Sequence, residues 1–186
     1  MKIVGISGVS GSGKTTLTKK LKRILHATTI FWDDFDEISQ APKDYVEWFK
    51  TSKDYQEWRY DALTETLISL KCGKEVLCPA TNKILKPTPI VLFDAPLGYR
   101  HHATGAQIDF LIYLDTPPDI ALARRLLRDR PNPQKEMKHY LAKARPVYML
   151  SYEQKNECDF IIDGSLPLEE IVKICLSRLA TFNADP

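Results

Sequence analysis

Short apolar runs alternate with longer amphipathic stretches along this chain. The runs lie at residues 2–7, 28–32, 89–94, 110–115 and 158–163. Most of their residues are apolar in succession rather than at every second position, which is typical of strands buried on both faces of a parallel sheet. A weaker pair of runs, at residues 76–78 and 83–85, predicts a small β-hairpin.

The stretches between the runs have the spacing of helices. Leu17, Leu21 and Ile24 fall on one face of a helix that follows the first strand. Residues 42–70 predict two helical pieces, of which the second runs from Trp58 to Leu70.

Further helices are predicted in the second half of the chain. One covers residues 116–130 with Thr116 as its N-cap, one covers residues 134–153 with a break at Pro146, and the last begins near Leu168. Strands that alternate with helices predict a parallel sheet covered on both faces. The chain is therefore expected to form one α/β domain over residues 1–186.

Composition narrows the class of protein. The chain of 186 residues has a formal net charge of +2, which gives no overall attraction to nucleic acid or to an anionic membrane. No apolar run approaches the roughly 20 residues that span a bilayer. The first strand begins too early for a signal peptide, and the spacing of the four cysteines favours reduced, packed thiols over disulfides or a zinc site. A cytoplasmic protein is expected.

The sequence from Gly8 to Thr15 is a complete G-x-x-x-x-G-K-[ST] motif between a strand and a helix. Its glycines allow successive backbone N–H groups to point at phosphate oxygens, and the helix N-terminus adds partial positive charge. Lys14 is expected to reach the outer phosphates and Thr15 to ligate Mg²⁺. The predicted nucleotide-binding residues of this segment are Gly8, Ser10, Gly11, Ser12, Gly13, Lys14, Thr15 and Thr16.

Acidic residues follow two of the predicted strands. Asp33, Asp34 and Asp36 come after residues 28–32, and Asp94 ends the run at 89–94. In open α/β sheets the carboxyl ends of the strands face the ligand. Asp33 is the candidate base, with Asp34 and Asp36 as rivals, and Thr15, Asp33 and Asp94 are the candidate magnesium ligands.

Arginines cluster shortly before a proline-rich break. Arg124, Arg125 and Arg128 have helical spacings, and guanidinium groups suit phosphate oxygens. Arg124 is predicted to bind nucleotide and Arg128 to act in catalysis. A segment at about residues 124–140 that carries them is predicted to be a lid. A solvated basic helix face is the alternative, and the cluster is too short to favour nucleic-acid binding.

Two further pairs of residues stand out. Tyr60-Asp61 opens the helix after the acidic cluster, where acceptor hydroxyls could be recognised, although Tyr60 is equally suited to be a packed aromatic ring. His101-His102 is accompanied by no third metal ligand at a recognisable spacing, so it is expected to lie in a surface loop.

Together these motifs resemble the uridine kinase and nicotinamide riboside kinase family of phosphate-loop nucleoside kinases. The similarity covers residues 5–17, the Asp33-Asp34-Phe35 sequence, residues 123–129 and residues 158–164. It implies an α/β/α sandwich of the phosphate-loop NTPase type, with a five-stranded parallel sheet and a helical lid. It also implies Asp33 as catalytic base, Asp34 and Asp61 on the acceptor side, and Arg128 in the lid and on the acceptor side.

The expected activity is therefore an ATP- and Mg²⁺-dependent transfer of the γ-phosphoryl group to a hydroxyl of a nucleoside, either uridine or cytidine or nicotinamide riboside. The chain departs from the family in the Asp-Asp-Phe-Asp sequence, in Asp94 and in the short Arg-Pro-Asn-Pro segment. Two alternatives stay open: a kinase of a non-nucleoside metabolite such as pantothenate or a sugar, and an ATP-binding regulatory module without turnover.

Overall fold

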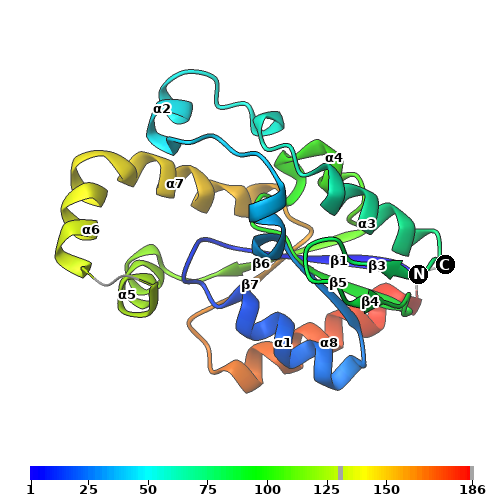
Figure 1. Ribbon diagram of the computed structural model, residues 1–186. Coiled ribbons are helices and arrows are strands. Elements are labelled where there is room, and N and C mark those ends of the chain that lie inside the picture. Colours follow the sequence, from blue (N-terminus) through cyan, green and yellow to red (C-terminus); the bar gives the residue numbers. More distant parts are fainter. Residues whose placement is uncertain (130–131, 185–186) are drawn as a thin grey trace.

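The computed structural model describes residues 1–129 and 132–184 (Figure 1). Its centre is a five-stranded sheet in which every neighbouring pair of strands is parallel, in the order β2-β5-β1-β6-β7. The strands are β1 (Lys2–Ser7), β2 (Thr28–Phe31), β5 (Ile90–Asp94), β6 (Phe110–Asp115) and β7 (Phe160–Asp163). The predicted α/β fold with five parallel strands is confirmed.

Helices cover both faces of the sheet (Figure 1). On one face, α1 (Lys14–Leu25) and α8 (Leu168–Ala184) pack against alternate strand residues such as Val4 and Leu92. On the other face, α3 (Asp61–Lys71) packs against the intervening residues, among them Ile3 and Phe93. Side chains of a strand point alternately to its two faces. The continuous apolar runs are thus divided between two cores.

Three further helices lie toward the carboxyl ends of the strands, opposite the N-terminus (Figure 1). They are α5 (Pro118–Asp129), α6 (Pro133–His139) and α7 (Arg145–Glu153), with a π-helical turn at Tyr140–Ala144 between the last two. A small third core joins Val9 of the phosphate loop to α5 and to Tyr148 of α7. Pro146 lies in the first turn of α7, where a helix tolerates a missing N–H, so the predicted break is where α7 begins.

Several predicted boundaries were wrong by one to three residues, including two beside the acidic turn. Strand β2 ends at Phe31, and a 3₁₀ turn, η1 (Trp32–Ile38), carries the acidic residues. Helix α3 begins at Asp61 rather than Trp58, because Arg59 forms an isolated antiparallel bridge with Gln40 after a 3₁₀ turn, η2 (Tyr55–Glu57). The short helix α2 (Tyr45–Lys50) precedes this turn.

The smaller predictions have mixed outcomes. The hairpin is confirmed as the antiparallel pair β3 (Val76–Leu77) and β4 (Ile84–Leu85). All four cysteines are free thiols as expected, but Cys72 is exposed and not packed. Residues 130 and 131 of the predicted helix and lid lie outside the described residues. Within the described ranges, no helix combines the length and the apolar character that crossing a membrane requires.

Candidate active site

The phosphate loop connects β1 to α1 in a backbone conformation that depends on glycine. Gly8, Gly11 and Gly13 all have positive φ, with values of 147°, 89° and 105°. A Cβ added at Gly11 would lie 2.0 Å from the carbonyl oxygen of Ala121, so α5 packs directly on the loop. The loop is therefore shaped by a helix more than a hundred positions later in the sequence.

Two polar groups of the loop suit a phosphate ligand. The Oγ atom of Ser12 is buried and, within the described part of the chain, has no hydrogen-bond partner. The Nζ atom of Lys14 lies 3.3 Å from the carbonyl oxygen of Val9, to which it donates a hydrogen bond. Buried polar groups usually have a partner. The unpaired Ser12 hydroxyl and the lysine are thus the donors that phosphate oxygens would satisfy.

Thr15 and Asp94 meet at the end of β5. The Thr15 hydroxyl donates a hydrogen bond of 2.7 Å to Oδ2 of Asp94, which is 6% exposed. Burial is the largest influence on the Asp94 carboxyl and raises its pKa. The charge of Lys14, the Thr15 hydrogen bond and the charge of Arg128 lower this pKa, and the charge of Asp33 raises it. The net pKa is above the ordinary value. Residues distant in sequence therefore act on one carboxyl group.

This donor set fits magnesium. Mg²⁺ prefers oxygen ligands and is usually held by one or two protein side chains together with water and substrate phosphates. Thr15 and Asp94 supply a hydroxyl and a carboxylate in contact, and the charge of Asp33 reaches Asp94. Among the described residues, no group of three or more His, Cys, Asp or Glu side chains could hold a metal by themselves.

The acidic turn η1 places its carboxylates differently from one another. Asp33, Asp34 and Asp36 are all exposed, but Asp36 also accepts a hydrogen bond of 2.6 Å from the hydroxyl of Tyr60. Burial raises the pKa of Asp36, the Tyr60 hydrogen bond lowers it, and the charge of Asp33 raises it. Tyr60 is buried, and its ring lies 4.2 Å from that of Trp32 between centroids. Tyr60 is thus a packed aromatic ring that also binds Asp36.

The three arginines of α5 have different surroundings. Arg124 is exposed, while the Cβ of Arg125 would be 3.2 Å from a Cβ built on Gly11. The charge of Arg128 reaches Asp94 and lowers its pKa. Arg125 therefore lies nearer to the loop than Arg124 does. Its spacing of four residues from Ala121, whose carbonyl contacts the loop, is the signal that could have identified it.

Two buried polar residues near the site were missed or misplaced by sequence reasoning. His101 is 2% exposed, so the expected surface loop is wrong for this residue, although His102 is exposed. The His101 ring is hydrogen-bonded to the Trp58 carbonyl and to the Thr104 hydroxyl. Gln154 is also buried and accepts a hydrogen bond from the hydroxyl of Ser7, at the last position of β1. Neither residue belongs to a recognisable motif, and each has a hydrogen-bond partner distant in the sequence, which is Trp58 for His101 and Ser7 for Gln154.

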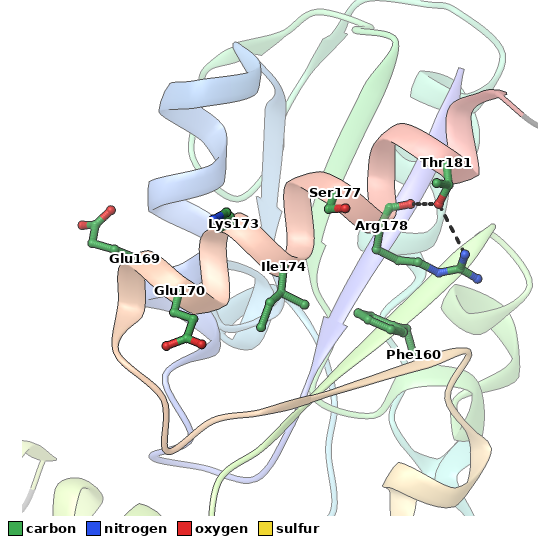
Figure 2. Close-up of a pocket in the computed structure, with 8 residues that line it drawn as sticks. All are labelled: Phe160, Glu169, Glu170, Lys173, Ile174, Ser177, Arg178 and Thr181. Carbon is green, nitrogen blue, oxygen red and sulfur yellow. Dashed lines mark hydrogen bonds between the residues drawn. The ribbon is translucent and has the colours of Figure 1, made fainter.

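A separate surface groove lies away from these residues. It has a volume of ≈ 840 Å³ and runs along α8 beside β7, with charged and apolar residues along it (Figure 2). The guanidinium of Arg178 lies over the rings of Phe110 and Phe160 and donates a hydrogen bond to Thr181. None of the lining residues belongs to the phosphate loop or to η1. We therefore assign the candidate active site to the loop and the carboxylates and not to this groove.

Known proteins resemble this chain in sequence and in fold. The chain is 29% identical over 178 residues to the uridine kinase of Staphylococcus aureus (strain JH9), with 86% of each chain covered. Its fold is similar to that of TT1252 from Thermus thermophilus, with a TM-score of 0.59 and 16% identity over 96% of this chain and 97% of the other. A gluconokinase from Sinorhizobium meliloti 1021 gives a TM-score of 0.58 at 16% identity, over 99% and 94%.

A family model settles the relationship. The model of the phosphoribulokinase / uridine kinase family matches residues 3–154, which include the phosphate loop, η1, Asp94 and α5. More than half of the chain is matched. The chain therefore belongs to the phosphoribulokinase / uridine kinase family.

Proposed function

We propose that this protein is an ATP- and Mg²⁺-dependent kinase that transfers the γ-phosphoryl group to a hydroxyl of a nucleoside-like small molecule. The observation that carries the proposal is the Thr15–Asp94 contact, which joins the phosphate loop to the carboxyl end of a neighbouring strand. The charge of Asp33 also reaches Asp94. Membership of the family supports a kinase of this type.

The phosphate side of the proposed site consists of the loop and its lysine. The loop N–H groups, the Ser12 hydroxyl and Lys14 would bind the triphosphate, with Gly8, Gly11 and Gly13 allowing the backbone to surround it. Ser10 and Thr16 flank these donors. Thr15 and Asp94 would hold Mg²⁺ directly, and Asp33 would act only on the water shell of the ion. When bound, the ion would neutralise charge on the phosphate oxygens.

The acceptor side consists of exposed carboxylates. We assign Asp33 as the base that removes the proton from the acceptor hydroxyl. The hydroxyl oxygen then forms a bond to the γ-phosphorus, the bond to the oxygen bridging the β- and γ-phosphates breaks, and ADP leaves. Asp34 and Asp61 would bind other hydroxyls of the acceptor. Tyr60 would contribute to this side of the site through its hydrogen bond to Asp36.

The lid is part of the same proposal. Residues 124–140 would close over the nucleotide within one kinase domain formed by residues 1–186. Arg128 would stabilise charge on the transferring group, and Arg124 would bind nucleotide from an exposed position. Helix α2 contacts α7 and the π-helical turn, so the segment after η1 already touches the helices that follow the lid.

A coupled assay of ADP release tests the proposal. The panel contains uridine, cytidine, adenosine, nicotinamide riboside, pantothenate and simple sugars, each with ATP and Mg²⁺ and then with EDTA in excess. We expect stimulation by a nucleoside and its loss with EDTA. ATP binding without turnover on any acceptor would contradict the kinase assignment, and stimulation by a sugar or pantothenate alone would contradict the acceptor class.

The same assay tests the base. We expect Asp33→Asn to lower turnover by about a hundredfold or more, the scale of general-base contributions, with ATP affinity retained. Asp34→Asn is the comparison variant, because Asp34 is the neighbouring exposed carboxylate and the rival for the role of base. A larger loss of turnover in Asp34→Asn would move the base to Asp34. An equal loss of ATP affinity in Asp33→Asn would make Asp33 a metal ligand or a structural residue.

A further inference from the structure

His101 is a buried histidine whose two ring nitrogens both form hydrogen bonds. Nε2 lies 2.7 Å from the carbonyl oxygen of Trp58, and because a carbonyl only accepts, Nε2 carries the proton and donates it. Nδ1 lies 2.8 Å from Oγ1 of Thr104 and accepts from that hydroxyl in the neutral ring. Burial lowers the pKa of His101, which favours this neutral form. The residue is therefore a fixed link between the segment after β5 and the segment before α3.

The same ring contacts the other acceptor-side segment. It lies edge-on to the ring of Trp32, with centroids 5.3 Å apart and an angle of 88° between the planes. Trp32 directly precedes Asp33, and Trp58 lies three positions before Asp61. The rings of Trp32 and Tyr60 are in contact, so the two segments also support each other. His101 thus holds both segments that carry the exposed acceptor-side carboxylates.

We infer that His101 is a positioning residue that fixes Asp33 and Asp61 relative to each other through Trp32 and Trp58. The inference rests on the proposed function, because it gives His101 a role in the acceptor half of that site. His101 is too buried to contact the acceptor itself. Its effect is expected on acceptor binding and transfer, because its ring contacts Trp32 of η1, the Trp58 carbonyl before α3 and Thr104 in α4 (His102–Gly105). Among the described residues, none of these partners belongs to the phosphate loop.

Three variants separate positioning from general stability. His101→Phe keeps an aromatic ring beside Trp32 but removes the bonds to Trp58 and Thr104. His101→Gln keeps an N–H donor for the Trp58 carbonyl. His102→Gln changes the adjacent exposed histidine and is the matched control. All are compared below the onset of thermal unfolding, as followed by circular dichroism.

Steady-state kinetics with the best acceptor give the first readout. We expect His101→Phe to lower kcat/KM for the acceptor by about tenfold or more, since misplacement by about 1 Å can cost up to about a hundredfold. ATP affinity, measured by calorimetry without acceptor, should stay within about twofold, and His101→Gln should recover most of the loss. An equal loss of ATP affinity, or a lower Tm with unchanged kinetics, would overturn the inference.

Fluorine NMR gives a readout that does not need turnover. The chain has three tryptophans, so 5-fluorotryptophan labelling gives a short spectrum that single Trp→Phe variants assign. We expect the Trp32 and Trp58 signals to move in His101→Phe, to return toward their original positions in His101→Gln and to stay in place in His102→Gln. Unmoved signals would overturn the inference. Absence of turnover on every acceptor in the unaltered protein would instead refute the proposed function and leave this readout to decide on His101.

Discussion

Replacing Gly11 by alanine tests how tightly α5 fixes the phosphate loop. The new Cβ would lie 2.0 Å from the carbonyl oxygen of Ala121 and 2.9 Å from its carbon. Real Cβ contacts are hardly ever shorter than 3.0 Å, so the two backbones would have to separate by about 1 Å. Because both groups belong to backbone, no side-chain rotation can relieve the contact.

The expected cost has two parts, and a second glycine separates them. Gly73 also has positive φ, 75° against 89° for Gly11, but a Cβ at Gly73 meets nothing within 4 Å. Gly73→Ala should therefore show backbone strain alone, about 1 kcal/mol after allowance for the stiffer unfolded chain. Gly11→Ala adds overpacking of about 1–3 kcal/mol. For a chain of this size the added cost lowers the Tm by roughly 2–12 °C more than in the control.

Urea unfolding followed by circular dichroism measures both variants, and calorimetry measures their ATP affinity. We expect Gly11→Ala to be less stable than Gly73→Ala by about 2 kcal/mol and to lose ATP affinity, because the loop is displaced from the phosphates. Equal free energies of unfolding for the two variants would refute the direct packing of α5 on the loop. Full ATP affinity in Gly11→Ala would refute the role of this loop conformation in binding.

Three further predictions concern buried groups. Because burial raises the Asp94 pKa, its ionised form lowers stability at neutral pH, and this cost disappears as the pH falls through the folded-state pKa toward 3.8. Asp94→Asn should therefore be at least as stable as the unaltered protein in urea at pH 7, and the difference in stability should be smaller near pH 4. Its turnover should fall about a hundredfold or more. A lower stability of the variant at pH 7 would contradict this reasoning. Tyr60→Phe should lower the free energy of unfolding in urea by about 1 kcal/mol, because it removes the donor to Asp36. A coupling energy of zero between Tyr60→Phe and Asp36→Asn in a double-mutant cycle would contradict this. Ellman's reagent should react rapidly only with the exposed Cys72, since the other thiols are partly or fully buried and burial raises the pKa of Cys158 and Cys175 to about 12; rapid reaction of more than one thiol in the native protein would contradict the packing.

Much of the architecture was predictable because it depends on local patterns. The apolar runs at residues 2–7, 89–94 and 110–115 correspond to β1, β5 and β6, since a strand buried on both faces must be apolar throughout. The motif from Gly8 to Thr15 could be recognised because its residues are consecutive, so one short loop contains both the proposed phosphate donors and the hydroxyl proposed to bind Mg²⁺. The boundaries at Phe31 and Asp61 were less predictable, because 3₁₀ turns and the bridge between Gln40 and Arg59 end the pattern early.

The sequence by itself determined the fold class, the phosphate loop and the set of carboxylates and arginines from which a kinase site could be built. Only the tertiary structure decided which of these residues meet: Thr15 with Asp94, Tyr60 with Asp36, and α5 with Gly11. It also placed His101 in the interior, between two segments that are far from it in the sequence. The physical reason is that periodicity reports how one element faces the core, whereas a hydrogen bond or a close backbone contact depends on where two distant elements are brought together.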